Sequence, residues 1–314
     1  CAAVGVRSRR PRVMPERLGS RPVKRDLRSK LRRNLGDAAA PTPRAAPVRS
    51  GASLRAYLER RRDRLAGPPR EPVDLPPGEE RENEQGAFFV RSLRYPWDMV
   101  HGWFPLGSVA DADWATVATW AKDEAFGAAN LEQCLFLDTE TTGLSGGAGT
   151  AVFLTGLGFA EADAFVVEQV FLRSFAEEPA ALTHVAARLG ERPLQVTFVG
   201  KSFDRHRLRN RMVLHRIESG VMDPRHLALY YLARRAFGAV LPDSRLRTVE
   251  EQRLGLRRHD DLPGSEAPQA WIDWLHDRTG PVDRVLEHNR LDVLSLVTLL
   301  GLLGRPVSKS EAVD

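Results

Sequence analysis

The sequence predicts an α/β fold in which a mixed central sheet, made of a three-strand meander plus further strands, is flanked by helices. Residues 134–172 contain three apolar stretches, CLFLDTE, TAVFLTGLGFA and AFVVEQVFL, each followed or separated by turn-forming residues, which is typical of consecutive strands. From residue 179 the apolar spacing becomes helical, interrupted by the short apolar run QVTFVG. Strands followed by helices and a further strand are the order expected of a sheet covered by helices.

The first part of the chain, residues 1–83, is expected to be a basic and mostly disordered arm. Residues 1–70 hold 20 Lys and Arg against 5 Asp and Glu, a net charge of +15, whereas the whole chain has a net charge of only +5. The arm is rich in Arg, Pro, Ala and Gly and has almost no aromatic residues, so it cannot bury enough apolar surface to offset the entropy of ordering. A basic arm on an acidic body is typical of proteins that bind a polyanion.

Two short basic helices are expected within the arm, over residues 26–36 and 53–67. Each combines a narrow apolar stripe with an arginine-rich face. Three interpretations remain open for these helices: a solvated face without a partner, contact with nucleic-acid phosphates, or contact with a membrane surface.

The folded domain is expected over residues 84–305, followed by a flexible tail at 306–314. Residues 72–86 are interpreted as an acidic linker, because large aromatic residues begin only at residue 88. A helix is expected at about 113–125, and the three meander strands come next, with the glycine-rich turn GLSGGAGT between the first two. The later helix candidates are residues 179–189, 203–217, 227–237, 250–256, 268–278 and 282–303.

Composition excludes several classes of protein. The two cysteines, Cys1 and Cys134, are too few for a disulfide framework or a cysteine zinc site, and they favour a reducing, cytoplasmic location. The longest apolar stretch, 293–303, is well short of the ~20 residues of a bilayer span, so no membrane partner is expected for the folded part. SGGAG lacks the lysine of a phosphate-binding loop. Trp271 and Trp274 are expected to be core residues and not a base-stacking platform.

Two carboxylates, Asp138 and Glu140, end the first meander strand. Because alternate residues of a strand point to the same face, both side chains lie on one side of the sheet. A pair of solvent-facing carboxylates at a strand end is the simpler interpretation. It is weakened by the TTGL that follows, in which Gly143 permits close approach of a ligand.

Three further residues could complete a site with this pair. Asp204 lies where a strand gives way to a helix, a position that a helix N-cap would also explain. Asp292 follows His288 by four residues in a strongly periodic helix, so the two side chains share a face. Taken alone, that spacing is more often a polar surface pair than a site.

Four carboxylates are the oxygen ligands that a pair of Mg²⁺ or Mn²⁺ ions requires. Two such ions about 3.5–4 Å apart activate water and stabilise the leaving oxyanion in phosphodiester hydrolysis. A neutral His288 would be able to accept the proton of the attacking water. Convergence of Asp138, Glu140, Asp204 and Asp292 would therefore predict a two-metal nuclease.

Three motifs in this order, DTETTGL, SFD and HNRLD, resemble the DEDD (DnaQ-like) exonuclease superfamily, which has a ribonuclease H-like fold. The longer stretches LFLDTETTGLSGGAGTAVFLTGLG, SRLRTVEEQRLGLRRHDDLPG and LEHNRLDVLSL resemble the bacterial YprB-like ribonuclease H-like domain family, a branch of predicted exonucleases. The resemblance covers roughly residues 85–304 and leaves the basic arm unexplained.

The resemblance implies roles for nine residues. Asp138, Glu140, Asp204 and Asp292 would bind the two metal ions, and His288 would orient or deprotonate water, although its spacing to Asp292 follows the form in which relatives carry a tyrosine. The residues that would contact substrate are Thr141, Gly143, Leu144 and Phe203. Leu144 and Phe203 match positions that pack against the terminal nucleotide in relatives, and ordinary core or turn packing is an equally open interpretation of these two. The chain departs from the pattern at Val199 and Gly200, where relatives usually carry an Asn.

Together these observations predict a metal-dependent nuclease, a 3′–5′ exonuclease that acts on single-stranded ends of DNA or RNA. An endonuclease of similar fold stays open, because the carboxylates do not determine polarity. The alternative is a nucleic-acid-binding or scaffold protein of the same fold whose site has decayed, which the departure at Val199 favours. Metal-dependent hydrolysis of an oligonucleotide discriminates between the two.

Overall fold

The computed structural model describes residues 71–143, 150–199, 204–218 and 225–306. The chain divides into two units, Cys1–Pro69 and Arg70–Asp314, and all described residues belong to the second. The expected arm helices, the tail from 307, and residues 144–149 of the glycine-rich turn lie outside the described residues.

The described part is built on a seven-stranded mixed sheet with the strand order β1-β2-β7-β6-β5-β8-β9. In that order the strands are β1 (Glu79–Asn83), β2 (Gly86–Pro96), β7 (Ala164–Phe171), β6 (Val152–Ala160), β5 (Cys134–Thr141), β8 (Leu194–Thr197) and β9 (Arg225–Ala228). Neighbours from β1 to β5 are antiparallel, and β8 and β9 extend the sheet parallel to β5. The predicted fold class, with its β5–β6–β7 meander, is therefore confirmed. A separate ribbon pairs β3 (Val100–His101) with β4 (Phe104–Pro105).

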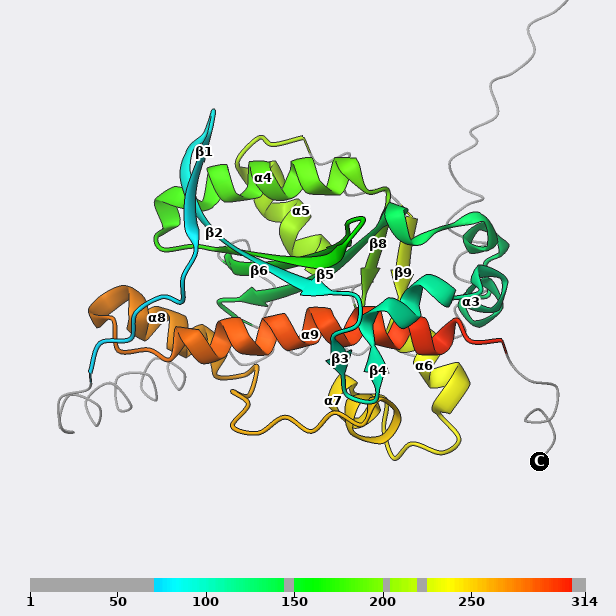
Figure 1. Ribbon diagram of the computed structural model, residues 1–314. Coiled ribbons are helices and arrows are strands. Elements are labelled where there is room, and N and C mark those ends of the chain that lie inside the picture. Colours follow the sequence, from blue (N-terminus) through cyan, green and yellow to red (C-terminus); the bar gives the residue numbers. More distant parts are fainter. Residues whose placement is uncertain (1–70, 144–149, 200–203, 219–224, 307–314) are drawn as a thin grey trace, which may run out of the picture. The chain divides into compact units, whose positions relative to one another are not determined.

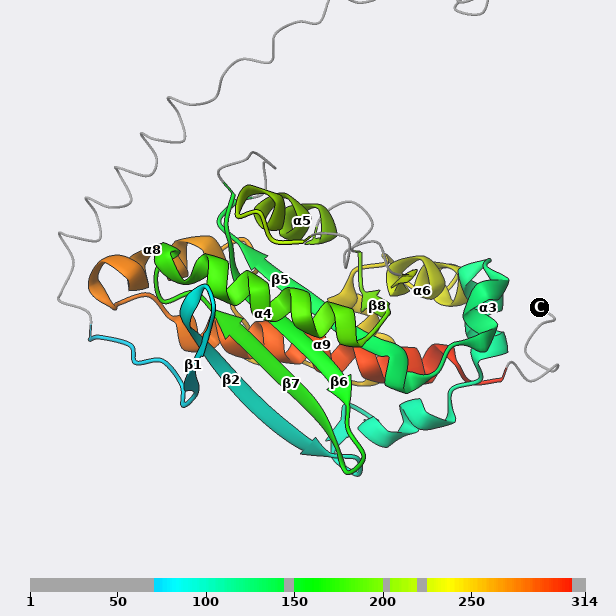
Figure 2. The same cartoon turned by 90° about the horizontal axis from the view of Figure 1, so that it is seen from above.

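Helices cover both faces of this sheet (Figure 1). They are α3 (Trp114–Ala121), α4 (Glu178–Glu191), α5 (Asp204–Leu214), α6 (Leu229–Phe237), α7 (Leu246–Val249), α8 (Ala267–Asp277) and α9 (Val282–Leu303). Shorter helical turns are η1 (Leu106–Asp111), η2 (Glu124–Ala128), η3 (Leu131–Gln133), η4 (Phe175–Glu177) and the π-helical turn η6 (Glu250–Leu254). Helices α4 and α5 lie over one face, and α9 runs along the other; Figure 2 shows the α4 face from above.

Coverage on both faces explains why β6 and β7 have no solvent-exposed side. Every residue of β7, and all but the last of β6, is buried, as expected for strands between two helical layers. Trp271 of α8 stacks on Phe153 of β6 with ring centroids 4.9 Å apart. Trp271 and Trp274 are 0% and 3% exposed, which confirms their prediction as core residues.

Helix α9 spans the residues predicted from the apolar periodicity. It is buried along most of its length and contacts β5, β6 and β7. Among the described residues, no helix combines the length and apolarity needed to cross a membrane.

Several local predictions were wrong. Residues 79–83 of the expected linker form strand β1, because their backbone pairs with β2. The helix expected to reach about residue 125 ends at Ala121, where Lys122 adopts a left-handed conformation with φ of 58°. Strand β2 was not anticipated, and β9 occupies the start of a segment that was predicted to be wholly helical.

Candidate functional site

Strand β5 delivers the first two predicted carboxylates at the edge of the core. Its first four residues are buried, whereas Asp138, Thr139 and Glu140 are only partly buried. The register with β6 shifts directly after Glu140, and such a bulge bends a strand and redirects the side chains beside it. Asp138 and Glu140, two residues apart, both meet side chains of α9.

Asn289 fixes Asp138 to α9. The fully buried Asn289 donates from Nδ2 to Oδ2 of Asp138 at 2.8 Å, and its Oδ1 accepts from Nε2 of Gln169 at 2.9 Å. Gly156 of β6 makes room for this amide, since a Cβ at that position would lie 2.4 Å from Asn289 Oδ1. The close docking of α9 on the sheet therefore depends on a residue without a side chain.

His288 and Asp292, one helical turn apart on α9, face the same region. Nε2 of His288 lies 3.9 Å from Oε1 of Glu140 and 3.8 Å from Oδ2 of Asp292. The side chains of His288 and Asp292 are 17% and 18% exposed. The described geometry thus brings Asp138, Glu140, His288 and Asp292 into one neighbourhood from two elements.

Helix α5 places Asp204 near the same strand end. Within the described residues the helix runs from Asp204 to Leu214, inside the segment 203–217 that was predicted to be helical, and the side chain of Asp204 lies outside the described part. One turn later, the buried Arg207 donates to Oγ1 of Thr141 at 2.7 Å and to the carbonyl of Gly143. These bonds tie the first turn of α5 to the end of β5.

A second contact holds the far half of α5. Glu178 of α4, 2% exposed, accepts from Nε of Arg211 at 2.6 Å and lies 2.8 Å from Nε2 of His215. The helix is therefore fixed at both ends.

Not every predicted substrate residue can be placed. Thr141 is buried and Gly143 is partly buried at the end of β5, whereas Leu144 and Phe203 lie outside the described residues, as does Gly200. Val199 is 45% exposed.

The carboxylates supply the oxygen ligands that hard divalent cations require. Among the residues whose side chains are described, no three His, Cys, Asp or Glu side chains are grouped so as to hold a metal ion. Asp204, the remaining predicted ligand, is not among those side chains. The donor set fits Mg²⁺ or Mn²⁺ in type.

Three residues missed by sequence reasoning surround the site, all in the segment 250–261. Arg258 pairs with Asp292 and with Glu250, and Asp261 Oδ1 lies 2.7 Å from Nδ1 of His288. Asn289 and Arg207 were missed as well. The stretch SRLRTVEEQRLGLRRHDDLPG was recognised as family-like, but a polar, arginine-rich run gives no signal that one arginine is buried.

Electrostatics set Arg258 apart from the surface arginines. Its side chain is 4% exposed, between the carboxylates of Glu250 (1%) and Asp292 (18%). Burial by itself would lower the pKa of Arg258, but the charges of Asp292 and Glu250 outweigh it and raise the pKa. Burial raises the pKa of Glu250, against the opposing effect of Arg258.

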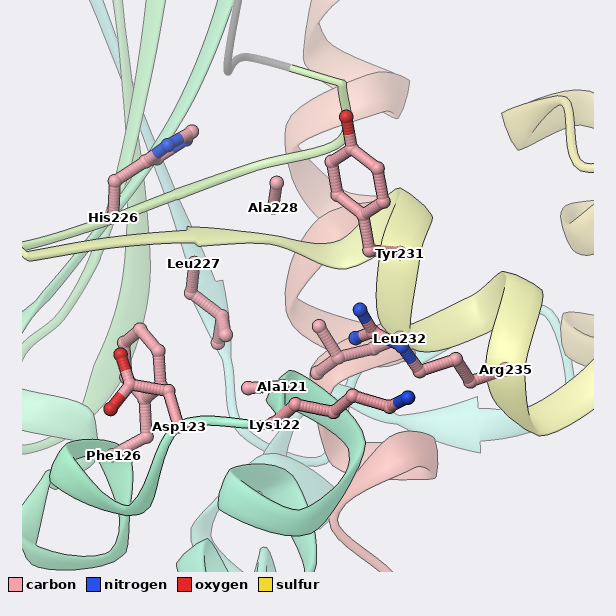
Figure 3. A pocket seen from close by; sticks show the side chains of 10 residues that line it. All are labelled: Ala121, Lys122, Asp123, Phe126, His226, Leu227, Ala228, Tyr231, Leu232 and Arg235. Carbon is pink, nitrogen blue, oxygen red and sulfur yellow. The ribbon is translucent and has the colours of Figure 1, made fainter.

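A pocket of about 200 Å³ lies apart from these residues, between η2, β9 and α6 (Figure 3). Its polar lining includes Lys122, Asp123, His226, Tyr231 and Arg235. None of the predicted metal ligands lines this pocket. Nε2 of His226, one of the residues that line the pocket, lies 2.9 Å from Oγ1 of Thr197.

Comparison with known proteins agrees with the fold. Residues 135–304, which include β5, α5 and α9, match the family described as the RNase_H superfamily. The chain belongs to the RNase H superfamily. It is also 31% identical over 218 residues to a protein of Bacillus subtilis (strain 168) named "Uncharacterized protein YprB". That match covers 67% of this chain but 51% of YprB, so the chain spans about half the length of this curated relative.

Membership of the RNase H superfamily gives the site a chemical context. The seven-stranded mixed sheet and its helical layers are consistent with an RNase H-like fold, and the match to YprB supports the YprB-like branch. The RNase H superfamily includes nucleases, and nucleases of this class generally use divalent metal ions.

Proposed function

We propose that this chain is a metal-dependent 3′–5′ exonuclease that hydrolyses phosphodiester bonds at single-stranded ends of nucleic acid. The observation that carries the proposal is the meeting of two elements: Nε2 of His288 lies within 4 Å of both Glu140 and Asp292, and Asn289 holds Asp138 to the same helix. Asp138, Glu140, Asp204 and Asp292 are the proposed ligands of two Mg²⁺ or Mn²⁺ ions. Ions so bound would activate water and neutralise charge on the phosphate.

His288 is the proposed general base. Its Nδ1 lies 2.7 Å from Asp261 Oδ1 and 3.4 Å from an Arg258 nitrogen. The shorter contact, to a carboxylate, favours the tautomer that carries its proton on Nδ1. Nε2 is then the acceptor, and it is the nitrogen that lies near Glu140 and Asp292. A base with that orientation can take a proton from water bound among these carboxylates.

The residues at the end of β5 are proposed to hold the substrate. Thr141 and Gly143 are fixed by Arg207. Among the described residues other than its chain neighbours, none has an atom within 4 Å of the position that a Cβ of Gly143 would occupy. Leu144 and Phe203 complete the proposed contacts with the terminal nucleotide.

The basic arm is proposed to add affinity that does not depend on sequence. Its net charge of +15 over residues 1–70 favours contact with phosphates, of DNA or of RNA. A cytoplasmic location fits the free thiol of the buried Cys134.

The proposal is tested with an oligonucleotide labelled at either end, in Mg²⁺ and in Mn²⁺. Wild-type protein is expected to release nucleotides from the 3′ end. Asp138→Asn should reduce that rate at least about 100-fold, since removing one electrostatic element of a catalytic site has effects of that order. Asp163→Asn is the matched control, because Asp163 pairs with Arg94 on the exposed surface.

The alternative function is nucleic-acid binding by a decayed site, which Val199 in place of the Asn of relatives favours. Wild-type protein that binds the oligonucleotide but releases no nucleotide with either ion would support the alternative and contradict the proposed exonuclease.

A further inference from the structure

The segment 250–261 packs a charged network against α9. It begins with the π-helical turn η6, and turns of this kind occur often at functional sites. Arg258 extends one nitrogen, Nη2, to Glu250 Oε1 and to Asp292 Oδ1, and its Nη1 lies 3.7 Å from Asp261 Oδ2. One guanidinium therefore meets three carboxylates, one of which is a proposed metal ligand.

Glu250 anchors this arginine from behind. Glu250 is fully buried, and the side chain of Arg258 is almost as inaccessible to solvent. A buried ion pair of this kind contributes little net stability, because desolvation offsets most of the attraction between the charges. The position of the pair, directly behind Asp292, points to a role in holding that carboxylate.

The two carboxylate oxygens of Asp292 have different neighbours. Oδ1 accepts from the guanidinium, whereas Oδ2 lies 3.8 Å from Nε2 of His288, on the side where Glu140 approaches the same nitrogen. A carboxylate fixed at one oxygen cannot rotate freely, so its other oxygen keeps one direction. Partners that orient a metal ligand in this way commonly contribute 10- to 100-fold to metal affinity.

We infer that Arg258, anchored by Glu250, is a positioning residue of the metal site, holding Asp292 so that Oδ2 faces the region shared with Glu140 and His288. This inference rests on the proposed function. The alternative is a purely electrostatic role, in which the guanidinium of Arg258 would compete with a cation for Asp292. The two roles have opposite signs: loss of a positioning residue weakens metal binding, and loss of a competing cation strengthens it.

The test measures Mn²⁺ binding to the full chain by titration calorimetry, with Arg258→Gln, Arg258→Lys and the double variant Glu250→Gln/Arg258→Gln. The double variant removes both members of the buried pair, so neither Glu250 nor Arg258 remains as a buried charge without the other. Arg284→Gln is the control, because Arg284 lies on α9 and donates to the carbonyl of the exposed Asp260. Thermal unfolding without metal identifies variants that do not fold.

We expect Arg258→Gln and the double variant to bind Mn²⁺ about 10- to 100-fold more weakly at one site. Arg258→Lys, which keeps the charge but loses the guanidinium fork, should recover part of the loss. Arg284→Gln should match wild type. A purely structural role would change the unfolding temperature and leave the Mn²⁺ affinity of the folded double variant intact.

Two results would overturn the inference and can be told apart. Unchanged or tighter Mn²⁺ binding by the folded variants, with normal binding by wild type, removes the positioning role and leaves the proposed nuclease standing. Absence of Mn²⁺ binding in the wild-type chain removes the metal site itself, and the proposed function fails together with the inference.

Discussion

Asn289 joins the first proposed ligand to the helix that carries the last one. Its side chain is fully buried and bonds to Asp138 on β5 and to Gln169 on β7. Because both ends of the amide have partners, its orientation is fixed by the hydrogen bonds around it. A single side chain thus couples the docking of α9 to the direction of a carboxylate.

Replacing Asn289 by Leu is expected to affect both stability and metal binding. The free energy of unfolding should fall by about 1–3 kcal/mol, because the buried Gln169 amide loses one of its two acceptors and keeps only the Leu286 carbonyl. The affinity for Mn²⁺ should fall about tenfold, because Asp138 loses a partner that orients it. Urea unfolding and titration calorimetry measure the two effects.

Asn130→Ala provides the comparison for this variant. Asn130 caps η3 by accepting from the Gln133 amide, and loss of a cap costs about 1 kcal/mol. It should be destabilised without any change in Mn²⁺ affinity. If Asn289→Leu behaved in the same way, Asn289 would support the fold and not the site.

At this scale, residue type and spacing were informative for some positions and silent for others. Asp138 and Glu140 could be assigned to one face, because alternation along a strand is a local property. Arg258 could not be found, because the stretch RRHDD is polar throughout and only tertiary packing buries one of its arginines. Asp261, next to Asp260, was equally hidden, since nothing local distinguishes the carboxylate that contacts His288.

Among the elements, α9 and the ribbon of β3 and β4 meet through a buried histidine. His101 is 5% exposed, and its Nε2 lies 2.9 Å from Oγ of Ser295 on α9. Burial, together with the nearby charges of Arg258 and Arg290, lowers the pKa of His101 to about 4. The histidine is therefore neutral in the folded protein at neutral pH.

This lowered pKa predicts a loss of stability in acid. Between pH 6.5 and about 4 the unfolded chain binds a proton at His101 that the folded chain does not, so the free energy of unfolding falls as the pH falls. The contribution is about 3 kcal/mol across that interval. His101→Gln, which cannot titrate, should flatten this part of the curve in urea unfolding at a series of pH values. An unchanged slope in that variant would show that other groups dominate.

The elements that could be predicted are those whose own residues show the apolar spacing of a strand or of a helix. The meander strands are mostly apolar, and the 22 residues of α9 keep helical spacing throughout. Strand β1, with the sequence EEREN, has no apolar pattern, and only its pairing with β2 makes it a strand. Strand β9 is four residues long and runs directly into α6, so the helical spacing obscured it.

For the whole molecule, the acidic described part and the basic segment before it form two differently charged regions. The described part also begins earlier than the sequence suggested. Trp274 donates from its indole nitrogen to the Val73 carbonyl, and the Val73 amide donates to the Arg278 carbonyl at 2.6 Å. Residues from about 71 onward therefore belong with the folded unit, and a truncation at 84 would remove an entire strand.

A chain that starts at residue 71 is expected to keep its fold and its chemistry but to bind nucleic acid more weakly. Loss of 20 Lys and Arg removes contacts with phosphates, so the slope of log affinity against log salt should become shallower. Fluorescence anisotropy with a labelled single strand at several salt concentrations measures the slope. An unaltered slope would mean that the arm does not contact the nucleic acid.

The central claim is that four carboxylates from β5, α5 and α9 hold a pair of cations, and a crystal structure of the protein soaked in Mn²⁺ tests it most directly. The account predicts two anomalous peaks roughly 3.5–4 Å apart, with Asp138, Glu140, Asp204 and Asp292 as ligands at ~2.0–2.6 Å. An Asp204 carboxylate ten or more ångströms from Asp138, far beyond that ligand range, with no anomalous peak between them, would contradict it.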